Sequence, residues 1–361
     1  MSVLALTRRG PLGNTLVRHL VLAVFGALAL LALTYGVSAY RDLQIANVGY
    51  YVVAVAGLTV LTGLNGQISL GHGALMMVGA YTAALFLERD NPPPLVVVLL
   101  LCVVATAAVG AVVGAAAARL RGPYLAGATL AFAVGLPGLT SHYSGTFGGD
   151  NGLTVLTGPP PARLGLDFPA ERWQAWITLT AALVTLVLLA NIASSRVGRT
   201  FRAVRDDEVS AELAGIHVAR TQVLAFIISA ACAGLAGGLF AVVSGQASPG
   251  AFSVALSLSI LAGAVLGGLG SLTGAVYGAI ALVLMPSLSS NVGDRFTLST
   301  NVQHNLPLLV YGTLLIVVML AAPHGLQGGV RRLFGLLRGR SPAAPVRNES
   351  VTDVSVTDPE R

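Results

Sequence analysis

A run of small and polar residues, "LNGQISLGHG" at 64–73, lies between two long apolar stretches of the chain. Its hydrogen-bonding side chains are Asn65, Gln67, Ser69 and His72. Polar side chains and bare backbone are costly in hydrocarbon unless they are paired. We interpret the run as a close approach of helices with hydrogen bonds inside a bundle. The alternative is that these groups only satisfy the backbone of a broken helix, with His72 as an ordinary interior histidine.

No catalytic motif accompanies this run. The glycines suggest a phosphate loop, but no GK[ST] follows them and the preceding stretch is helical. HExxH and GxSxG are absent, and Cys102 and Cys232 lie in apolar spans without a CxxC or a neighbouring histidine. All fifteen carboxylates are expected in loops or tails, which argues against a proton relay inside the membrane. We therefore expect no enzyme, no metal and no cofactor.

The charged segment at 194–220 predicts a short helix that the membrane part does not need for folding. Asp206 can cap it, Asp207 and Glu208 fall in its first turn, and Gly215 can end it. Its apolar residues Val209, Leu213 and Ile216 fall on one side. Such a helix is typical of a docking element for a partner protein. An ordinary positively charged connector is the alternative.

Glycines also recur at helical spacing near the end of the apolar region. Gly263, Gly267, Gly270, Gly274 and Gly278 follow at intervals of 4, 3, 4 and 4, and "GGLGS" at 267–271 is a natural break. Gly238 belongs to a second small-residue repeat, with Gly234. These patterns predict tightly packed helix faces.

The composition indicates which elements hold these residues. Hydrophobic residues make up 55% of the 361 and charged residues only 10%, as in an integral membrane protein. With about 20 residues per span, we expect an all-α bundle of about ten transmembrane helices with a broken or re-entrant segment at 64–73. The spans are expected at 20–39, 46–64, 72–88, 94–118, 123–141, 173–193, 221–243, 252–268, 271–290 and 305–322.

Arginine placement predicts the orientation. With the N-terminus inside, inner segments hold 16 of the 21 arginines, so both termini are expected in the cytoplasm. The arginines lie beside apolar spans, so we expect a lipid bilayer and no nucleic acid as partner. The expected division is 1–19 as an inner segment, 20–322 as the transmembrane domain and 323–361 as an inner tail, disordered from 341. An external loop at 144–172 and the inner loop at 194–220 interrupt the transmembrane domain.

Several stretches resemble the LivM-like permease subunits of ABC importers for branched-chain amino acids. They are "LTGLNGQISLGHGALMMVGAYTAAL" at 61–85, "RLRGPYLAGATLAFA" at 119–133, "GTFGGDNGLTVL" at 145–156, the segment 198–241, and "GGLGSLTGAVYGA" at 267–279. The resemblance implies a subunit in a bacterial inner membrane that works by alternating access. Its implied partners are two cytoplasmic ATPases, a second homologous permease and an external solute-binding protein.

The resemblance also implies roles for the residues introduced above. The inner loop becomes the segment coupled to the ATPase, with Arg205, Asp207, Glu208, Glu212, Ala214 and Gly215 as its expected coupling residues. Asn65, Gln67, Ser69 and His72 become candidates for the translocation path or its gate, and Gly238, Gly267, Gly270 and Gly274 for helix packing. Related permeases carry urea, short amides or other amino acids, so these solutes remain alternatives. A secondary transporter or channel is the alternative from another class.

Overall fold

The computed structural model describes residues 34–120, 123–161, 165 and 168–295, together with positions 26, 312, 313, 316 and 326–328. Within this part of the chain, five helices are long and apolar enough to cross a bilayer. Three shorter apolar helices accompany them. The structure confirms the predicted all-α membrane bundle.

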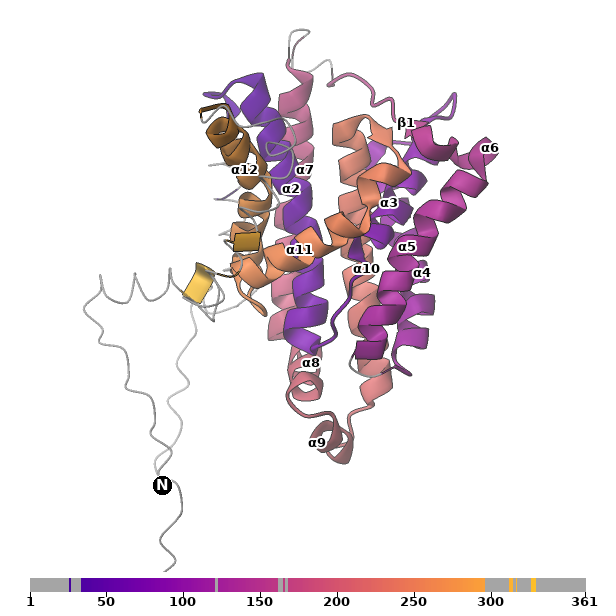
Figure 1. Ribbon diagram of the computed structural model, residues 1–361, viewed down its shortest axis with the longest axis vertical. Helices are drawn as coiled ribbons and strands as arrows, with labels where there is room; N and C mark the ends of the chain where they lie inside the picture. Colours follow the sequence, from indigo (N-terminus) through magenta and orange to yellow (C-terminus); the bar gives the residue numbers. More distant parts are fainter. Residues whose placement is uncertain are drawn as a thin grey trace, which may run out of the picture.

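The elements follow the sequence in this order (Figure 1). The long helices are α2 (Ala39–Leu58), which continues as the π-helical turn η2 (Thr59–Leu64), α4 (Leu95–Ala117), α5 (Pro123–His142), α7 (Ala170–Ser194) and α10 (Val218–Ser244). The shorter helices are α3 (His72–Leu87) and α11 (Val254–Gly267), with α12 (Leu272–Arg295) after them. The charged segment forms α8 (Arg196–Asp206) and α9 (Glu208–Leu213). The remaining elements are α6 (Ser144–Phe147), η3 (Gly149–Asn151), η5 (Pro249–Phe252), and the strands β1 (Leu153–Thr154) and β2 (Gln246–Ala247).

Proline and glycine mark several helix boundaries. α4 begins directly after Pro94, whose missing N–H costs nothing at a helix start. α10 ends at Gly245, where φ is +69°, a conformation that glycine adopts without steric cost. Gly268 and Gly270 also have positive φ and separate α11 from α12. The predicted break at 267–271 is therefore confirmed.

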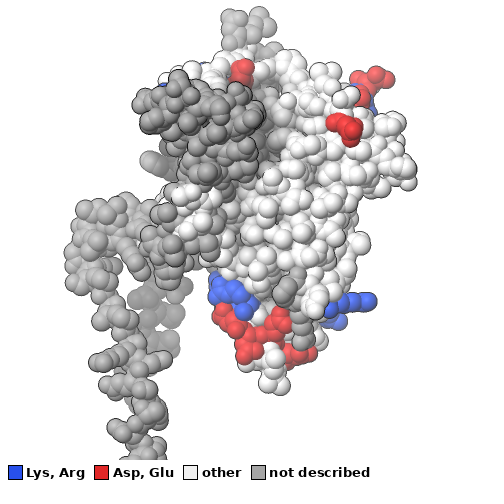
Figure 2. All heavy atoms as spheres, in the orientation of Figure 1, with Lys and Arg blue, Asp and Glu red and all other residues white. Residues whose placement is uncertain are grey.

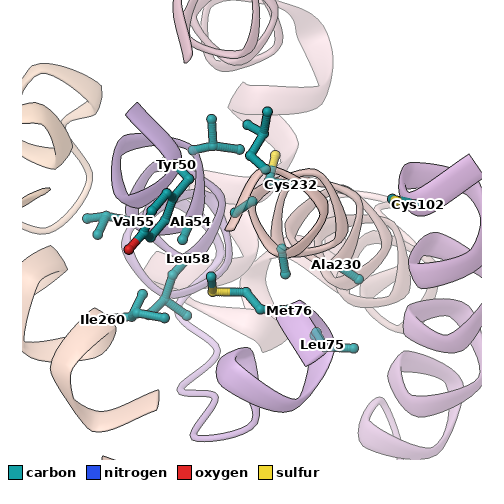
Figure 3. Packing of buried hydrophobic residues seen from close by; sticks show 14 of the residues in the cluster. Tyr50, Ala54, Val55, Leu58, Leu75, Met76, Cys102, Ala230, Cys232 and Ile260 are labelled. Atoms are coloured by element: carbon teal, nitrogen blue, oxygen red, sulfur yellow. The ribbon is translucent and has the colours of Figure 1, made fainter. Parts of the chain in front are cut away.

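Helices α2 and α10 form the centre of the bundle. α10 packs against α2, α3 and α4, while α2 packs against α7 and α12. In their most apolar stretches, 72% of α2 and 67% of α10 is buried, against 22% of α4 and 28% of α7. In Figure 3, Leu58 of α2 lies beside Met76 of α3, and Cys232 of α10 packs against Gly57 of α2. α4 and α7 therefore turn most of their apolar surface outward, as helices in contact with lipid do.

Each predicted span between residues 46 and 290 coincides with a helix. The predicted spans at 20–39 and 305–322 lie largely outside the described residues, as do the segments 1–19 and 341–361, so the total of ten stays a prediction. α2 begins at Ala39, earlier than expected, and this places Asp42 inside a helix, fully buried. The expectation that every carboxylate lies in a loop or tail is wrong for Asp42. The reason is long-range: Arg172 pairs with this carboxylate.

Charged side chains gather at the two ends of the bundle. On the face shown in Figure 2, an uncharged belt separates them, and the denser group of charges lies at the end where α8 and α9 protrude. The strands β1 and β2 and helix α6 lie at the opposite end (Figure 1). This distribution fits a protein that spans a bilayer with its charges in water.

Candidate functional site

The predicted interruption near 64–73 is present between η2 and α3. The α2 helix widens into the π-helical turn η2, and Gly66 then takes a φ of +80° that ends the helical path. Residues 66–71 are irregular, and α3 begins at His72. Figure 1 shows this stretch rising from the α8 end of the bundle toward its middle, where α3 starts. Non-helical backbone at membrane depth is tolerated only where protein or a polar cavity surrounds it.

Hydroxyl groups satisfy part of the interrupted backbone. Ser69 Oγ accepts a hydrogen bond from the Gly71 N–H at 3.3 Å, and Thr62 donates to the Gln67 carbonyl at 3.0 Å. Two other helices contribute. Thr129 of α5 accepts from the Leu70 N–H, and Ser257 of α11 accepts from the Gly73 N–H, both at 3.0 Å. Ser69 therefore has the structural role that the alternative interpretation gave to the whole run.

The other three polar side chains of the run are buried without such partners. Asn65 is 3% exposed, and neither its amide oxygen nor its nitrogen makes a hydrogen bond within the described residues. Gln67 Oε1 is likewise buried and unpaired there, and the buried ring nitrogens of His72 make no hydrogen bond of good geometry, their polar neighbour being the Ala54 backbone. Leaving a buried polar group unpaired costs about 1–3 kcal/mol. Unlike Ser69, these side-chain atoms make no hydrogen bond among the described residues that would stabilise the interrupted backbone and offset this cost.

Glycines allow neighbouring elements to approach the interruption closely. A Cβ at Gly71 would lie 2.8 Å from the Thr129 carbonyl oxygen, and one at Gly73 would lie 2.7 Å from Ser257 Oγ. At Gly63, a Cβ would collide with the backbone of Gly270. The interruption is thus enclosed by α5, α11 and the α11–α12 turn, with no room for larger side chains at these positions.

The charged segment at 194–220 forms two helices where one was expected. α8 is amphipathic, and its buried residues Gly198, Phe201 and Val204 face the bundle. Helix α8 runs to Asp206, so Asp206 does not cap the docking helix as expected. Asp207 is the N-cap of α9, because the extended backbone at that residue ends α8 and starts the next helix.

Asp207 holds the first turn of α9 through three hydrogen bonds. Its Oδ1 accepts from the N–H groups of Val209 and Ser210 at 2.9 and 3.0 Å, and its Oδ2 accepts from Ser210 Oγ at 3.0 Å. These bonds, chiefly the one from the Ser210 N–H, lower the pKa of the Asp207 carboxyl from its ordinary value. Glu208 connects α9 to α10, because its Oε1 accepts from Gln222 Nε2 at 2.9 Å.

The other end of α9 is a Schellman-type cap. Ala214 is the C-cap, and Gly215 follows with a φ of +83°. The Gly215 N–H bonds to the Glu212 carbonyl, and the Ile216 N–H bonds to the Ala211 carbonyl. Between the two caps, Val209 and Leu213 are 68% and 85% exposed. α9 therefore presents apolar side chains to solvent at the charged end of the bundle.

The predicted packing glycines lie at helix crossings or in the turn between helices. A Cβ at Gly238 on α10 would lie 2.9 Å from Cys102 Sγ on α4. Gly267 and Gly274 face each other across the α11–α12 turn, where a Cβ at Gly274 would lie 2.5 Å from the Gly267 carbonyl oxygen. Gly270 lies in that turn with a φ of +85°.

Two features at the end of the bundle opposite α8 and α9 were not indicated by any sequence pattern. Arg172 Nε lies 3.4 Å from Asp42 Oδ2, which joins the first turns of α7 and α2. The loop after α5 pairs with the end of α10 through β1 and β2, and the Val155 N–H donates to the Gly245 carbonyl at 2.8 Å. These partners are far apart in sequence, so no local spacing signals them.

Thr129 and Ser257 were also missed, because each is one of several hydroxyl residues in its helix and no local spacing distinguishes it. An apolar groove of about 770 Å³ lies between α4, α7 and α10, and none of the four path candidates lines it. Within the part of the chain that the structure describes, no three His, Cys, Asp or Glu side chains are placed to hold a metal ion.

The fold and the interrupted helix define a class: a multi-pass α-helical membrane protein with a discontinuous span, an arrangement typical of transport proteins. Residues 43–319 match the family model described as the permease component of the branched-chain amino acid transport system, and the chain belongs to this family. The resemblance stated from the sequence is thereby confirmed.

Individual relatives agree with the family assignment. The chain is 30% identical over 314 residues to the high-affinity branched-chain amino acid transport system permease protein LivM of Salmonella typhimurium, covering 81% of this chain and 71% of the relative. It is 31% identical over 312 residues to LivM of Escherichia coli, covering 80% and 70%. The permease protein LivH of E. coli is 37% identical over 155 residues, covering 43% and 47%. No solved structure matches the chain.

Proposed function

We propose that the chain is the membrane permease subunit of an ATP-driven importer for branched-chain or similar apolar amino acids. One observation carries the proposal: a member of this permease family presents a capped helix with exposed apolar residues, α9, at the charged end of its bundle. Relatives that cover most of the chain are named as permeases of high-affinity branched-chain amino acid transport systems. ATP hydrolysis is assigned to partner subunits.

The proposed mechanism is alternating access. α8 and α9 face the cytoplasm, as the arginine distribution predicts, and α9 seats in a partner ATPase through Val209 and Leu213. Asp207 and Gly215 fix the two ends of the helix. Closure of the ATPases displaces α9, and the interruption at 65–71 changes between outward-open and inward-open arrangements. Asn65, Gln67 and His72 are the proposed polar groups of the path, and Ser69 is a structural residue beside them.

The proposed assembly contains a second, homologous permease, two ATPases and an external solute-binding protein in a bacterial inner membrane. The match to LivH over 43% of the chain supports a related permease as partner, since LivH and LivM are both named as permeases for branched-chain amino acids. The loop at 144–172, which β1 and β2 attach to α10, is the proposed contact for the binding protein.

Reconstitution of the importer tests the proposal. The tagged chain is co-expressed with candidate ATPases, a candidate second permease and a candidate binding protein from the same organism, purified, and placed in vesicles loaded with ATP. We expect the ATPases to co-purify and uptake of labelled leucine to require both ATP and the binding protein. Labelled urea serves as the competing solute, and uptake of urea in place of leucine would reassign the substrate. Leucine uptake by the chain alone, without ATP, would instead indicate a secondary transporter or channel.

A further inference from the structure

Arg205, in the last turn of α8, lies where three elements meet. Its Nη1 donates a hydrogen bond to the carbonyl oxygen of Gly63 in η2 at 2.8 Å. A Cβ at Gly66 would lie 2.9 Å from Arg205 Cγ, and one at Gly270 would lie 3.8 Å from Arg205 Nη1. The arginine therefore joins α8 to the interrupted helix and to the α11–α12 turn. The family resemblance implied that Arg205 couples to the partner ATPase, whereas its guanidinium bonds to the bundle.

The acceptor of this bond belongs to a helix end. The last carbonyls of a helix lack intrahelical N–H partners, and an arginine there can donate to them and interact favourably with the helix dipole. Asp206 orients the donor, because its Oδ1 lies 3.0 Å from Arg205 Nε and 2.8 Å from Nη2. The guanidinium is thus held by a carboxylate of its own helix on one side and by the start of the interruption on the other.

The same arginine lies two positions before Asp207, the N-cap of α9. Any displacement of α9 acts on Arg205 through this short connection. Arg205 in turn bonds to the carbonyl of Gly63, which lies two positions before Asn65. We infer that Arg205 is a positioning residue that transmits movement of the docking helix α9 to the interrupted segment 65–71. The inference rests on the proposed function, in which α9 docks on an ATPase.

A simpler role for Arg205 is to cap η2 without transmitting anything. The two roles predict different measurements. A residue that only caps would lower the amount of folded complex when it is removed, and ATP hydrolysis and leucine uptake would fall together. A transmitting residue would leave the ATPases bound and hydrolysing while uptake per ATP falls. The ratio of leucine transported to ATP hydrolysed therefore separates the two roles.

The test uses the complete importer with Arg205→Ala, Arg205→Lys and Arg199→Ala. Arg199 is the matched control, because it is an exposed arginine of the same helix whose side chain, among the described residues, hydrogen-bonds only to the nearby Ser194 carbonyl. We expect Arg205→Ala to retain the ATPases but to lose about tenfold in leucine uptake per ATP, the scale of one lost charge-assisted hydrogen bond. Arg205→Lys can still donate one bond and should recover part of the ratio. Arg199→Ala should match the wild type.

A direct readout accompanies the ratio. With Asn65→Cys, a change of thiol labelling between the ATP-bound and nucleotide-free importer reports movement of the interrupted segment, and Arg205→Ala should abolish this change. A wild-type uptake ratio in Arg205→Ala, or an equal fall of complex yield, hydrolysis and uptake, would overturn the inference. Failure of the unmodified importer to retain ATPases would instead overturn the proposed function.

Discussion

Ser69 and Asn65 lie on the same interruption of the bundle but have different surroundings. Ser69 Oγ accepts the Gly71 N–H, so its removal leaves a buried backbone donor unpaired. The Asn65 amide is buried and has no hydrogen bond among the described residues. The structure of the interruption therefore depends on Ser69, and the amide of Asn65 is available for another partner. Substituting each residue separates the two roles.

We predict that Ser69→Ala destabilises the permease, because an unsatisfied buried donor costs about 1–3 kcal/mol. Its amount in the membrane should fall, and uptake should fall in proportion. Asn65→Leu removes only unpaired polar atoms, so the amount of protein should hold while leucine uptake per molecule falls. Immunoblots of membranes with transport normalised to protein check both. Normal specific uptake by Asn65→Leu would remove this residue from the path.

At the scale of the element, the two ends of α9 determine whether it can dock. Asp207→Ala removes the N-cap and its hydrogen bonds to the first turn, whereas Asp207→Asn keeps an amide oxygen in the capping position. Gly215→Val forces a β-branched residue into a φ of +83°. We expect Asp207→Ala and Gly215→Val to weaken ATPase co-purification with unchanged permease abundance. Gly250→Val, at an open position without positive φ, is the control.

The same cap makes α9 sensitive to acid. Hydrogen bonds in the folded state lower the Asp207 pKa, so the capping contribution is present above the unfolded pKa and is lost as pH falls through the lower, folded value. In acid, where the Asp207 carboxyl is protonated, substitution of this residue should therefore no longer weaken ATPase co-purification. Asp207→Asn, which has no carboxylate, should not share that part of the pH dependence. Equal pH profiles for the wild type and Asp207→Asn would contradict this account.

Helix packing at Gly238 and Gly274 gives a third prediction at the scale of the element. Leucine at Gly238 would collide with Cys102 on α4, and leucine at Gly274 would collide with the backbone of Gly267. Overpacking of this kind typically costs about 1–3 kcal/mol, so both variants should show low membrane levels or a lower thermal unfolding midpoint. Gly135→Leu on α5 is the control, because nothing lies within 4 Å of its Cβ position. Wild-type levels of all three would show that these crossings tolerate bulk.

The sequence predicts elements better than it predicts contacts. Apolar length, the glycine break at 267–271 and the polar run at 64–73 are local patterns, and each corresponds to a boundary in the structure. Asp42 was misplaced because its partner, Arg172, is 130 residues away. No sequence pattern indicated which way the Arg205 side chain points, because its acceptor is a backbone carbonyl that any residue could supply. Similarly, the Asp-Asp pair at 206–207 allowed two cap positions, and the length of α8 decided between them.

At the scale of the whole molecule, the arginine distribution predicts that α9 and the β1–β2 end face opposite sides of the membrane. Cysteines at Glu212 and Gly158 test this, since both positions are exposed and both native cysteines are buried. In a background without Cys102 and Cys232, an impermeant thiol reagent applied to intact cells should label Gly158→Cys only. Glu212→Cys should react after the cells are opened. Labelling of both positions in intact cells would contradict the orientation.

Helix α10 runs between the two ends of the molecule and is attached at both. At one end, β2 and the Gly245 carbonyl hold the loop that follows α5. At the other end, Gln222 in the first turns of α10 bonds to Glu208 of α9. With 27 residues, α10 is about 40 Å long. A single continuous helix therefore connects the loop at the β1–β2 end with α9 at the other end, along a route that does not include the interrupted segment.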